Sequence, residues 1–347
     1  MPPKVNKQDR ICAELSVEPL KEKQAEIKQA IIAGDHGRAA KLKAAFVKAK
    51  KWNITDTLSV VFENPDATGA DVPITQSGNM DTTNGPMDPL QLNFLEQGDS
   101  LNIAAAVQEI VEKRIDPLVG LTFLFNGKWD GTYRENEIVI SFANDGAWSV
   151  VGTDINYETT QRPTMNFGWF DVATVMHEFC HALGMIHEHQ NPYGTEIDWN
   201  IEALDAYMLE TQGWDSDMTY AQIVEKYNQN DINGSSFDPC SVMLYFFPSS
   251  LTNNNVGTNQ NLRMSGTDME WLSNQYPGGE FNGLSGVEEF YLECYPDEDN
   301  LEENISKCNT MAAQFGGSQA PNTSNLLNTK NIVIGLLIIL IIVAILK

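Results

Sequence analysis

The sequence is poor in cysteine and in basic side chains, and it has no internal repeat. Its five cysteines are scattered over 347 residues, too few for a disulfide framework in a chain of this size. At most, we expect Cys294 and Cys308 to pair locally. Only 22 Lys and Arg residues stand against 47 Asp and Glu residues, a formal net charge of −25. Because nucleic acids attract positively charged surfaces, this composition argues against nucleic-acid binding as the main function.

The few basic residues are concentrated near the amino terminus. Residues 1–51 contain 12 of the Lys and Arg residues but only 6 of the acidic ones. Ala, Lys, Glu and Gln dominate there, and apolar residues recur at helical spacing around Gly34 and Gly37, which predicts a basic helical hairpin. Its charged face is typical of a solvated surface, with contact to anionic lipid or nucleic acid as the alternative. The polar start of the sequence does not predict a secretory signal peptide.

Residues 52–279 have the composition of one folded domain. The 42% hydrophobic content of the chain is ample for a buried core. Apolar residues at intervals of three and four predict a helix that ends near Arg114, and a loop is expected around Trp148 and Gly152. Runs of β-branched and aromatic residues predict strands at Thr57–Phe62, Leu121–Phe125, Glu137–Phe142 and the shorter Thr164–Phe167.

Two further regions follow Pro277-Gly278-Gly279 in the sequence. Residues 280–330 are acidic and then rich in Asn, Ser, Thr and Gln, which predicts a linker. Ile332 to Leu346 holds 15 residues without one polar side chain, or about 22 Å of helix against a hydrocarbon core of about 30 Å. Flanking lysines can reach the two interfaces. We therefore expect residues 331–347 to form a single-pass C-terminal membrane anchor, with a buried apolar helix as the alternative.

Four of the five histidines lie within 13 consecutive residues, in the segment HEFCHALGMIHEHQNP; they are His177, His181, His187 and His189. His177 and His181 are four residues apart, so on a helix they share one face and can bind one metal ion. On the same straight helix His187 would point away from that face, so the helix has to end before it. Gly184 can end it, because glycine adopts the left-handed conformation at no steric cost.

This spacing predicts a catalytic zinc site. Three neutral imidazoles, from His177, His181 and His187, with an open fourth position are typical of catalytic rather than structural zinc. Glu178 follows the first ligand, about 100° further around the helix, so its carboxylate flanks the metal. Zinc lowers the pKa of a bound water to about 7, and Glu178 can accept the proton and pass it to a leaving amine. The pattern HExxHxxGxxH therefore predicts peptide hydrolysis, and a metal-free polar helix face is the disfavoured alternative.

The histidine segment resembles the metzincin clan of zinc endopeptidases, and the astacin family in particular. Glu188, directly after the third histidine, is the residue that astacins carry there. Ser241–Tyr245 (SVMLY) is similar to the family's Met-turn, and Trp148–Gly152 (WSVVG) is similar to its W-S-x-x-G segment. The resemblance implies an α+β fold over residues 52–279, with a twisted mixed sheet, an active-site helix and a Met-turn. A helical N-terminal extension and a C-terminal hydrophobic helix would flank this domain.

The resemblance also implies roles for the site residues. His177, His181 and His187 would bind one Zn²⁺ per chain, with Glu178 as the base. Met243 would form an apolar floor beneath the metal. Tyr245 would be a further ligand that swings away to hydrogen-bond the oxyanion of the intermediate. Ordinary core packing is the alternative for both Met243 and Tyr245.

Other expectations from the resemblance concern the surroundings of the site. Thr164–Trp169 falls where the edge strand that pairs with substrate is expected, and Leu262–Tyr276 would be the closing helix. Glu188 would pair with a processed amino terminus, although the inhibitory prosegment motif F-x-G-D is not recognisable before residue 52. Ala147 stands where astacins have a disulfide cysteine, so disulfide stapling is not expected.

From the sequence, the leading hypothesis is a zinc metalloendopeptidase that acts on protein or peptide substrates. Its C-terminal segment would bind membrane lipid. The alternatives are a catalytically silent binding module with a metzincin fold and a membrane adaptor that acts through residues 1–51. The intact Glu178 and the complete ligand set argue against a silent module, and an adaptor leaves residues 171–245 unexplained.

Overall fold

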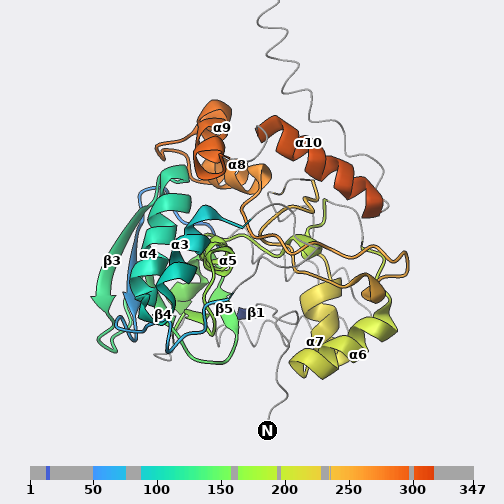
Figure 1. Ribbon diagram of the computed structural model, residues 1–347, viewed down its shortest axis with the longest axis horizontal. Helices are drawn as coiled ribbons and strands as arrows, with labels where there is room; N and C mark the ends of the chain where they lie inside the picture. Colours follow the sequence, from blue (N-terminus) through green and yellow to red (C-terminus); the bar gives the residue numbers. More distant parts are fainter. Residues whose placement is uncertain are drawn as a thin grey trace, which may run out of the picture.

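The computed structural model describes residues 13–15, 50–75, 87–157, 163–193, 197–227, 234, 236–296 and 301–315. These residues form a mixed β-sheet with helices packed on it, a smaller group of helices beside it, and helices from the C-terminal part of the chain (Figure 1). The predicted α+β architecture with a mixed sheet and helices is confirmed.

The sheet has six strands in the order β1-β5-β6-β4-β2-β3. β5 and β6 pair antiparallel, and the other neighbouring strands pair parallel. The strand bounds are β1 Ala13–Leu15, β2 Thr57–Phe62, β3 Thr122–Lys128, β4 Glu137–Ser141, β5 Ala147–Val150 and β6 Met165–Phe167. All five residues of β4 are buried, as expected of a parallel strand covered on both faces. The four strands that the sequence predicts are therefore all present.

Two expectations about the sheet are wrong. The region around Trp148, expected as a loop, forms β5, in which Trp148 is paired with Asn166 of β6. Asn166 is buried, and its amide donates to the carbonyl of Ala143 at 3.0 Å and to the Asp145 carboxylate at 2.9 Å, which fixes the turn before β5. Thr164–Trp169 is not an edge, because β6 lies between β4 and β5. The local sequence favours a strand there but carries no information on its lateral neighbours.

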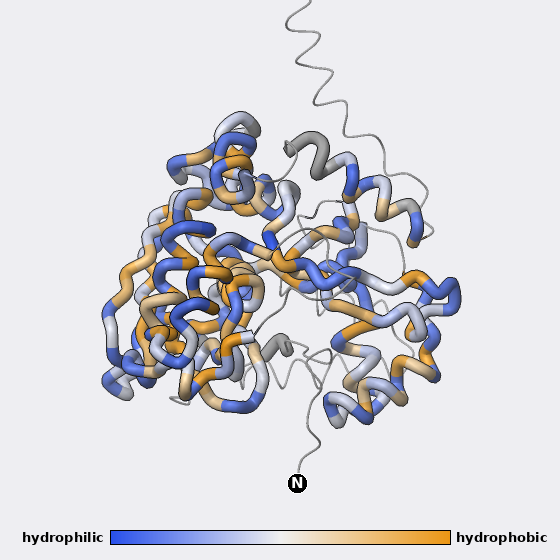
Figure 2. The backbone as a smooth tube through the Cα atoms, in the orientation of Figure 1, coloured by the Kyte–Doolittle hydropathy of each residue, from blue (hydrophilic) through white to orange (hydrophobic). Residues whose placement is uncertain are grey.

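Three helices cover the sheet and supply much of the core. They are α3 Pro89–Gln97, α4 Ile103–Arg114 and α5 Val172–Ala182. The predicted helix end at Arg114 is confirmed, and the cap at its start is Asn102, whose side chain accepts the N–H of Ala105 at 2.7 Å. α4 packs against α5, and α5 packs against β5. Figure 2 shows the hydrophobic residues gathered along these helices and strands, with hydrophilic residues at the connecting loops.

A second, smaller group of elements lies beside the sheet, at the lower right of Figure 1. It contains α6 Ile201–Gln212 and α7 Ser216–Thr219, which continues into one π-helical turn, Tyr220–Val224. Leu204, Met208 and Ile223 form an apolar cluster there, which also includes Tyr245. Short 3-10 turns connect the remaining elements, at Gly98–Ser100, Asp116–Leu118, Gly152–Tyr157, Glu188–Gln190, Ser249–Leu251 and Ala313–Phe315.

The C-terminal part of the described chain is helical. α8 Gly266–Gln275 is the expected closing helix, with narrower bounds than the sequence predicts. α9 Gly283–Cys294 and α10 Leu301–Ala312 lie where the sequence favours a linker. Val287, Phe290, Tyr291 and Cys294 of α9 are buried in the main core. Their spacing of three and four residues is that of a helix face, so the structure differs from the predicted linker because an apolar stripe runs through an acidic segment.

The residues just before β2 are anchored to the domain. The Lys50 ammonium forms a buried ion pair with Asp154 at 2.8 Å, and the Trp52 indole donates to the carbonyl of Ala182 at 2.8 Å. The Lys50 carbonyl also packs against Gly152, where an added Cβ would lie 2.0 Å from its oxygen. Of residues 1–51, only β1, Lys50 and Lys51 are described, so the predicted helical hairpin lies outside the described residues.

The predicted membrane anchor, residues 331–347, also lies outside the described part of the chain. Among the described residues, no helix is long and apolar enough to span a membrane. The anchor therefore stays a prediction from the sequence.

Candidate metal centre and active site

Helix α5 carries two of the predicted zinc ligands, and its first turn is capped. The carboxylate of Asp171 accepts the N–H of Thr174 at 2.8 Å and the hydroxyl of Thr75 at 2.6 Å. A side-chain cap of this kind satisfies a backbone donor that the helix leaves free. Ten of the eleven residues of α5 are buried, so packing on every side holds the helix and orients His177 and His181.

The helix ends at the glycine that the sequence predicts. Gly184 has φ 90°, in the left-handed region, and its N–H donates to the carbonyl of His181 at 2.8 Å. The N–H of Met185 donates to the carbonyl of Cys180 at 2.9 Å, which closes the last turn. The Tyr276 hydroxyl donates to the carbonyl of Leu183 at 2.7 Å and holds the turn from outside. The expected change of direction before the third histidine is confirmed.

The turn brings the three predicted ligands together. His177, His181 and His187 are all buried, and each offers a ring nitrogen within 4.8 Å of the other two. The Nε2 atoms of His181 and His187 lie 2.9 Å apart, and Nε2 of His177 has no hydrogen-bond partner. Buried nitrogen atoms that converge in this way fit a metal ion with imidazole ligands.

Backbone carbonyls orient two of these rings from behind. Nδ1 of His177 lies 2.8 Å from the carbonyl of Val242, and Nδ1 of His181 lies 2.8 Å from the carbonyl of Met185. A proton on Nδ1 leaves Nε2 as the metal-binding atom, which is the usual arrangement for a histidine ligand. The donor set and its support therefore fit zinc.

The surroundings favour the neutral form of two of the three imidazoles. Burial lowers the pKa of His177 well below its usual range, and the neighbouring His181 lowers it further. Burial also lowers the pKa of His187 well below its usual range, again with His181 as the next cause. A metal ligand needs the neutral imidazole, so these shifts favour the binding form near neutral pH.

Glu178 and Tyr245 complete the predicted catalytic group. Glu178 follows His177 in α5 and is completely buried. The ring of Tyr245 is nearly buried and lies against the ligands, with its centroid 4.2 Å from that of His187 and 6.0 Å from that of His177. The structure therefore places Tyr245 against the ligand rings and buries Glu178 beside His177 in the chain.

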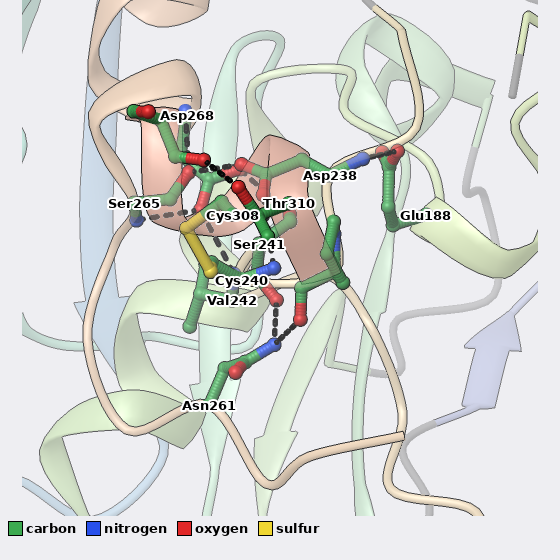
Figure 3. The surroundings of a disulfide bond; sticks show 12 residues. Glu188, Asp238, Cys240, Ser241, Val242, Asn261, Ser265, Asp268, Cys308 and Thr310 are labelled. Atoms are coloured by element: carbon green, nitrogen blue, oxygen red, sulfur yellow. Dashed lines mark hydrogen bonds between the residues drawn. A yellow bond between two sulfur atoms is a disulfide. The ribbon is translucent and has the colours of Figure 1, made fainter. Parts of the chain in front are cut away.

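The Met-turn is held by a buried polar network, part of which is drawn in Figure 3. Asp268 of α8 accepts the Ser241 hydroxyl at 2.6 Å and the N–H of Val242 at 2.8 Å. The side-chain amide of Asn261 donates to the carbonyl of Ser241 at 2.8 Å. Met243, within this turn, is completely buried. Because Val242 in turn contacts His177, the network fixes the second layer of the metal site.

Glu188 is half-buried, and its carboxylate binds the loop before the Met-turn. Its carboxylate accepts the N–H of Asp238 at 2.8 Å and the side-chain amide of Asn191 at 2.9 Å, and its own N–H donates to the carbonyl of Met243 at 3.0 Å. Burial raises the pKa of Glu188 well above its usual range, while these hydrogen bonds act in the opposite direction. Glu188 therefore links the third histidine to the Met-turn, and its pairing with a processed amino terminus stays a prediction.

Sequence reasoning gave no role to two residues beside the site. His189 is buried and stacks on His187, with centroids 5.2 Å apart and an interplanar angle of 16°, and its Nε2 lies 3.0 Å from the carbonyl of Gln222. The sequence signal that could have indicated His189 was its position within the cluster of four histidines. Asp268 closes a capping box with Ser265. The spacing Ser-x-x-Asp before a helix signals a cap, but it does not reveal the contact with the Met-turn.

The cysteines differ from expectation. Cys240 forms a disulfide with Cys308, whereas Cys294 is a buried free thiol, as is Cys180 within α5. The expected local pair of Cys294 and Cys308 is therefore wrong. Cys294 lies in α9, where it is packed in the main core, and Cys308 lies in the next helix and points to Cys240 (Figure 3).

Comparison with known proteins agrees with this site. Residues 121–268 match the family model described as Astacin, a family of peptidases. A solved structure of myroilysin is 26% identical, with a TM-score of 0.48, covering 67% of this chain and 98% of that chain. High choriolytic enzyme 1, a hatching enzyme zinc-protease from Oryzias latipes (medaka fish), is 14% identical, with a TM-score of 0.37, covering 65% and 93%. A search of curated proteins gave no match. The family match contains the histidines and the Met-turn, and it confirms the predicted resemblance.

Proposed function

We propose that this protein, whose residues 121–268 carry the astacin peptidase match, is a zinc-dependent endopeptidase that cleaves protein or peptide substrates. The observation that carries the proposal is the convergence of three buried imidazoles beside a buried glutamate. His177, His181 and His187 would hold one zinc ion. When bound, zinc supplies a Lewis acid that activates water near neutral pH and polarises the scissile carbonyl.

Glu178 is the proposed general base. It accepts a proton from the attacking water and later donates that proton to the leaving amine. A carboxylate suits both steps if its position relative to the metal is fixed, and α5 fixes it, because nearly the whole helix is buried. The supporting carbonyls of Val242 and Met185 hold the ligand rings still while the proton moves.

Tyr245 is the proposed oxyanion donor. Its ring already lies against His187 and His177, so its phenol can approach the carbonyl oxygen of a substrate held at the metal. A preorganised donor of this kind stabilises charge that develops in the transition state. We assign the binding of the substrate backbone to β5, which becomes the edge of the sheet when β1 is removed. An extended peptide can pair with such an edge whatever its side chains.

The N-terminal extension is proposed to keep the enzyme latent. β1 pairs in parallel with β5, from Ala13 opposite Trp148 to Leu15 opposite Val150. A substrate strand that pairs with β5 would need the same backbone groups. Cleavage of the chain between β1 and Lys50 is therefore expected to raise peptidase activity. Unchanged activity after cleavage and removal of the fragment would contradict this role for residues 1–51.

A casein digestion tests the proposed function. The protein cleaved between β1 and Lys50 and freed from the N-terminal fragment should cleave casein, a zinc chelator should stop cleavage, and added zinc should restore it. In this processed form Glu178→Gln should keep stoichiometric zinc but lose activity by about 10³-fold, because the ligands are intact while proton transfer fails. Residual activity above about a tenth of wild type would exclude Glu178 as the base. Processed wild type that binds zinc and cleaves nothing would favour the silent binding module.

We also propose that Ile332–Leu346 anchors the protein to a membrane. The support is the length of this apolar run and the two flanking lysines, Lys330 and Lys347. Carbonate extraction of membranes tests the proposal, with a chain that ends at Lys330 as the control. Full-length protein in the soluble fraction would contradict the anchor without affecting the proposed peptidase activity.

A further inference from the structure

A disulfide joins the Met-turn to a helix near the end of the described chain. Cys240 immediately precedes the segment Ser241–Tyr245, and its partner Cys308 lies 68 residues later in α10. The two Cα atoms are 5.7 Å apart, and both side chains are buried (Figure 3). The bond therefore ties α10 to the loop that supports the metal site.

The loop that begins at Cys240 contacts the predicted ligands within three residues. The carbonyl of Val242 accepts Nδ1–H of His177 at 2.8 Å. The carbonyl of Met243 accepts the N–H of Glu188, the residue directly after His187, at 3.0 Å. A displacement of this loop would thus act on two of the three ligands, and such supporting contacts govern metal affinity.

The disulfide is the one fully buried attachment among the described side chains of α10, those of residues 306–312. Of these, only that of Cys308 is buried, and those of Ser306, Lys307, Asn309 and Thr310 are exposed. The helix also contacts α8 and α9, and Phe315, just after it, meets the ring of Phe237 edge-on at 5.5 Å. A segment whose described side chains are mostly exposed opens at lower cost once its covalent tie is removed.

The start of this loop is also held from the other side. The N–H of Cys240 donates to the carboxylate of Asp238 at 2.9 Å, and Asp238 in turn accepts the hydroxyl of Ser265, the cap of α8, at 2.6 Å. The disulfide therefore joins α10 to a loop that is already tied to α8.

We propose that Cys240 and Cys308 form a redox site that couples α10 to the metal centre. With the disulfide formed, α10 covers the Met-turn and the histidines retain zinc; with the pair reduced, α10 separates, the loop loosens and zinc is held less tightly. The loss of peptidase activity that follows rests on the proposed function, whereas the coupling itself does not.

The chemistry is thiol–disulfide exchange with an external disulfide, either a small molecule such as glutathione disulfide or a disulfide oxidoreductase. The two cysteine thiols give up two electrons and two protons as their S–S bond forms. The external S–S bond breaks, and its two sulfurs take up the electrons and protons as thiols. An external dithiol reverses the reaction.

Amide hydrogen exchange on the metal-free full chain tests the coupling directly. We expect Cys308→Ala, and wild type reduced by a phosphine that is then removed, to exchange the amides of residues 241–245 about tenfold faster than the oxidised wild type. Cys294→Ala is the matched control, because it also removes a buried thiol but leaves the disulfide intact. It should leave exchange at residues 241–245 unchanged. Reoxidation of the reduced wild type should restore slow exchange.

Zinc affinity, measured by competition with a chromophoric chelator, gives the second readout. It should fall by about tenfold in Cys308→Ala and in the reduced chain, but not in Cys294→Ala. Equal exchange rates and equal zinc affinities in the oxidised and reduced wild type would overturn the proposal. If even the oxidised wild type binds no zinc, the proposed function fails, and the exchange rates alone decide whether the redox site controls the loop.

Discussion

Helices α5 and α10 are nearly equal in length, but they are held in opposite ways. Ten of the eleven residues of α5 are buried, and a side-chain cap fixes its start. Of the described side chains of α10, only that of Cys308 is buried, and it is joined covalently to Cys240. The position of α5 therefore follows from many weak contacts, whereas α10 is joined to the start of the Met-turn by a covalent bond. The two helices thus support the metal site in different ways, one through packing and one through a bond that a reductant can break.

The largest expected effect is on the metal itself. His187→Ala should weaken zinc binding on the order of 10³-fold or more, because two imidazoles hold zinc poorly. This change tests whether His187, in the turn after α5, contributes as much to zinc binding as the two histidines in the helix do. Metal analysis of the purified chain is the measurement. Full zinc occupancy in this variant would show that His187 is not a ligand.

A cavity in α5 should reduce stability strongly. Phe179 is completely buried and meets Phe123 edge-on at 6.2 Å. Phe179→Ala should lower the free energy of unfolding by about 3–5 kcal/mol, because the lost burial and the residual cavity both destabilise the fold. Urea denaturation of the metal-free chain measures this loss. A change below about 1 kcal/mol would mean that α5 is held less tightly than its burial implies.

Substitution of Tyr245 distinguishes a catalytic role of its hydroxyl from a packing role of its ring. Tyr245→Phe should lower kcat by about 10²-fold with little change in KM, if the phenol acts on the oxyanion. The ring and its contacts with His187 stay in place, so stability should be nearly unchanged. Steady-state kinetics on a peptide substrate decides the matter. An unaltered kcat would reduce Tyr245 to a packing residue.

The pH dependence of stability tests the buried polar network in which Asp268 of α8 holds the Met-turn. Burial and, next to it, the negative charge of the nearby Asp238 raise the pKa of Asp268 to about 7. In the unfolded chain this pKa is about 3.9. The folded state therefore binds the extra proton, and this contribution to stability is fully present below about pH 4 and is lost as the pH rises to about 7.

When the pH rises from about 5 to about 7.5, we expect the free energy of unfolding of wild type to fall by about 1–3 kcal/mol more than that of Asp268→Asn. Denaturation of both metal-free chains at the two pH values gives the comparison. An equal change in the free energy of unfolding of both chains between these pH values would show that Asp268 does not titrate in this range.

The smallest effect is expected on the surface of α10. Asn309 is exposed and is the neighbour of Cys308. Asn309→Ala should change the free energy of unfolding by no more than about 0.5 kcal/mol, because an exposed side chain without buried contacts contributes little. Thermal denaturation of Asn309→Ala and of Phe179→Ala under the same conditions compares the two losses of stability. A loss as large as that of Phe179→Ala would mean that α10 has anchors other than its disulfide.

The parts of the site that the sequence predicts are those formed by local geometry. His177, His181 and Gly184 lie within two turns of one helix, so their spacing alone indicates how they converge. β2 was predicted with the bounds that the structure has, because four of its six residues are β-branched or aromatic. A local sequence pattern thus predicts a single helix or strand and the turn that ends it.

Other features depend on contacts between distant segments. The pairing of Cys240 with Cys308 spans 68 residues, and only the folded chain brings the two together. The place of β6 between β4 and β5 is likewise a matter of lateral order, which no single strand encodes. Helix α9 is a different case, since its apolar stripe was readable but acidic neighbours favoured a linker. The N-terminal hairpin and the membrane anchor stay predictions.

The buried ion pair of Lys50 with Asp154 sets a limit on how short a stable recombinant form of this protein can be. Composition places the domain start at residue 52, but a chain that begins there would leave the Asp154 carboxylate buried without the Lys50 ammonium. Loss of one partner from a buried pair costs about 3–5 kcal/mol. The neighbouring Trp52 holds the end of α5, since its indole donates to the carbonyl of Ala182. We therefore expect a stably folded fragment to begin no later than Lys50.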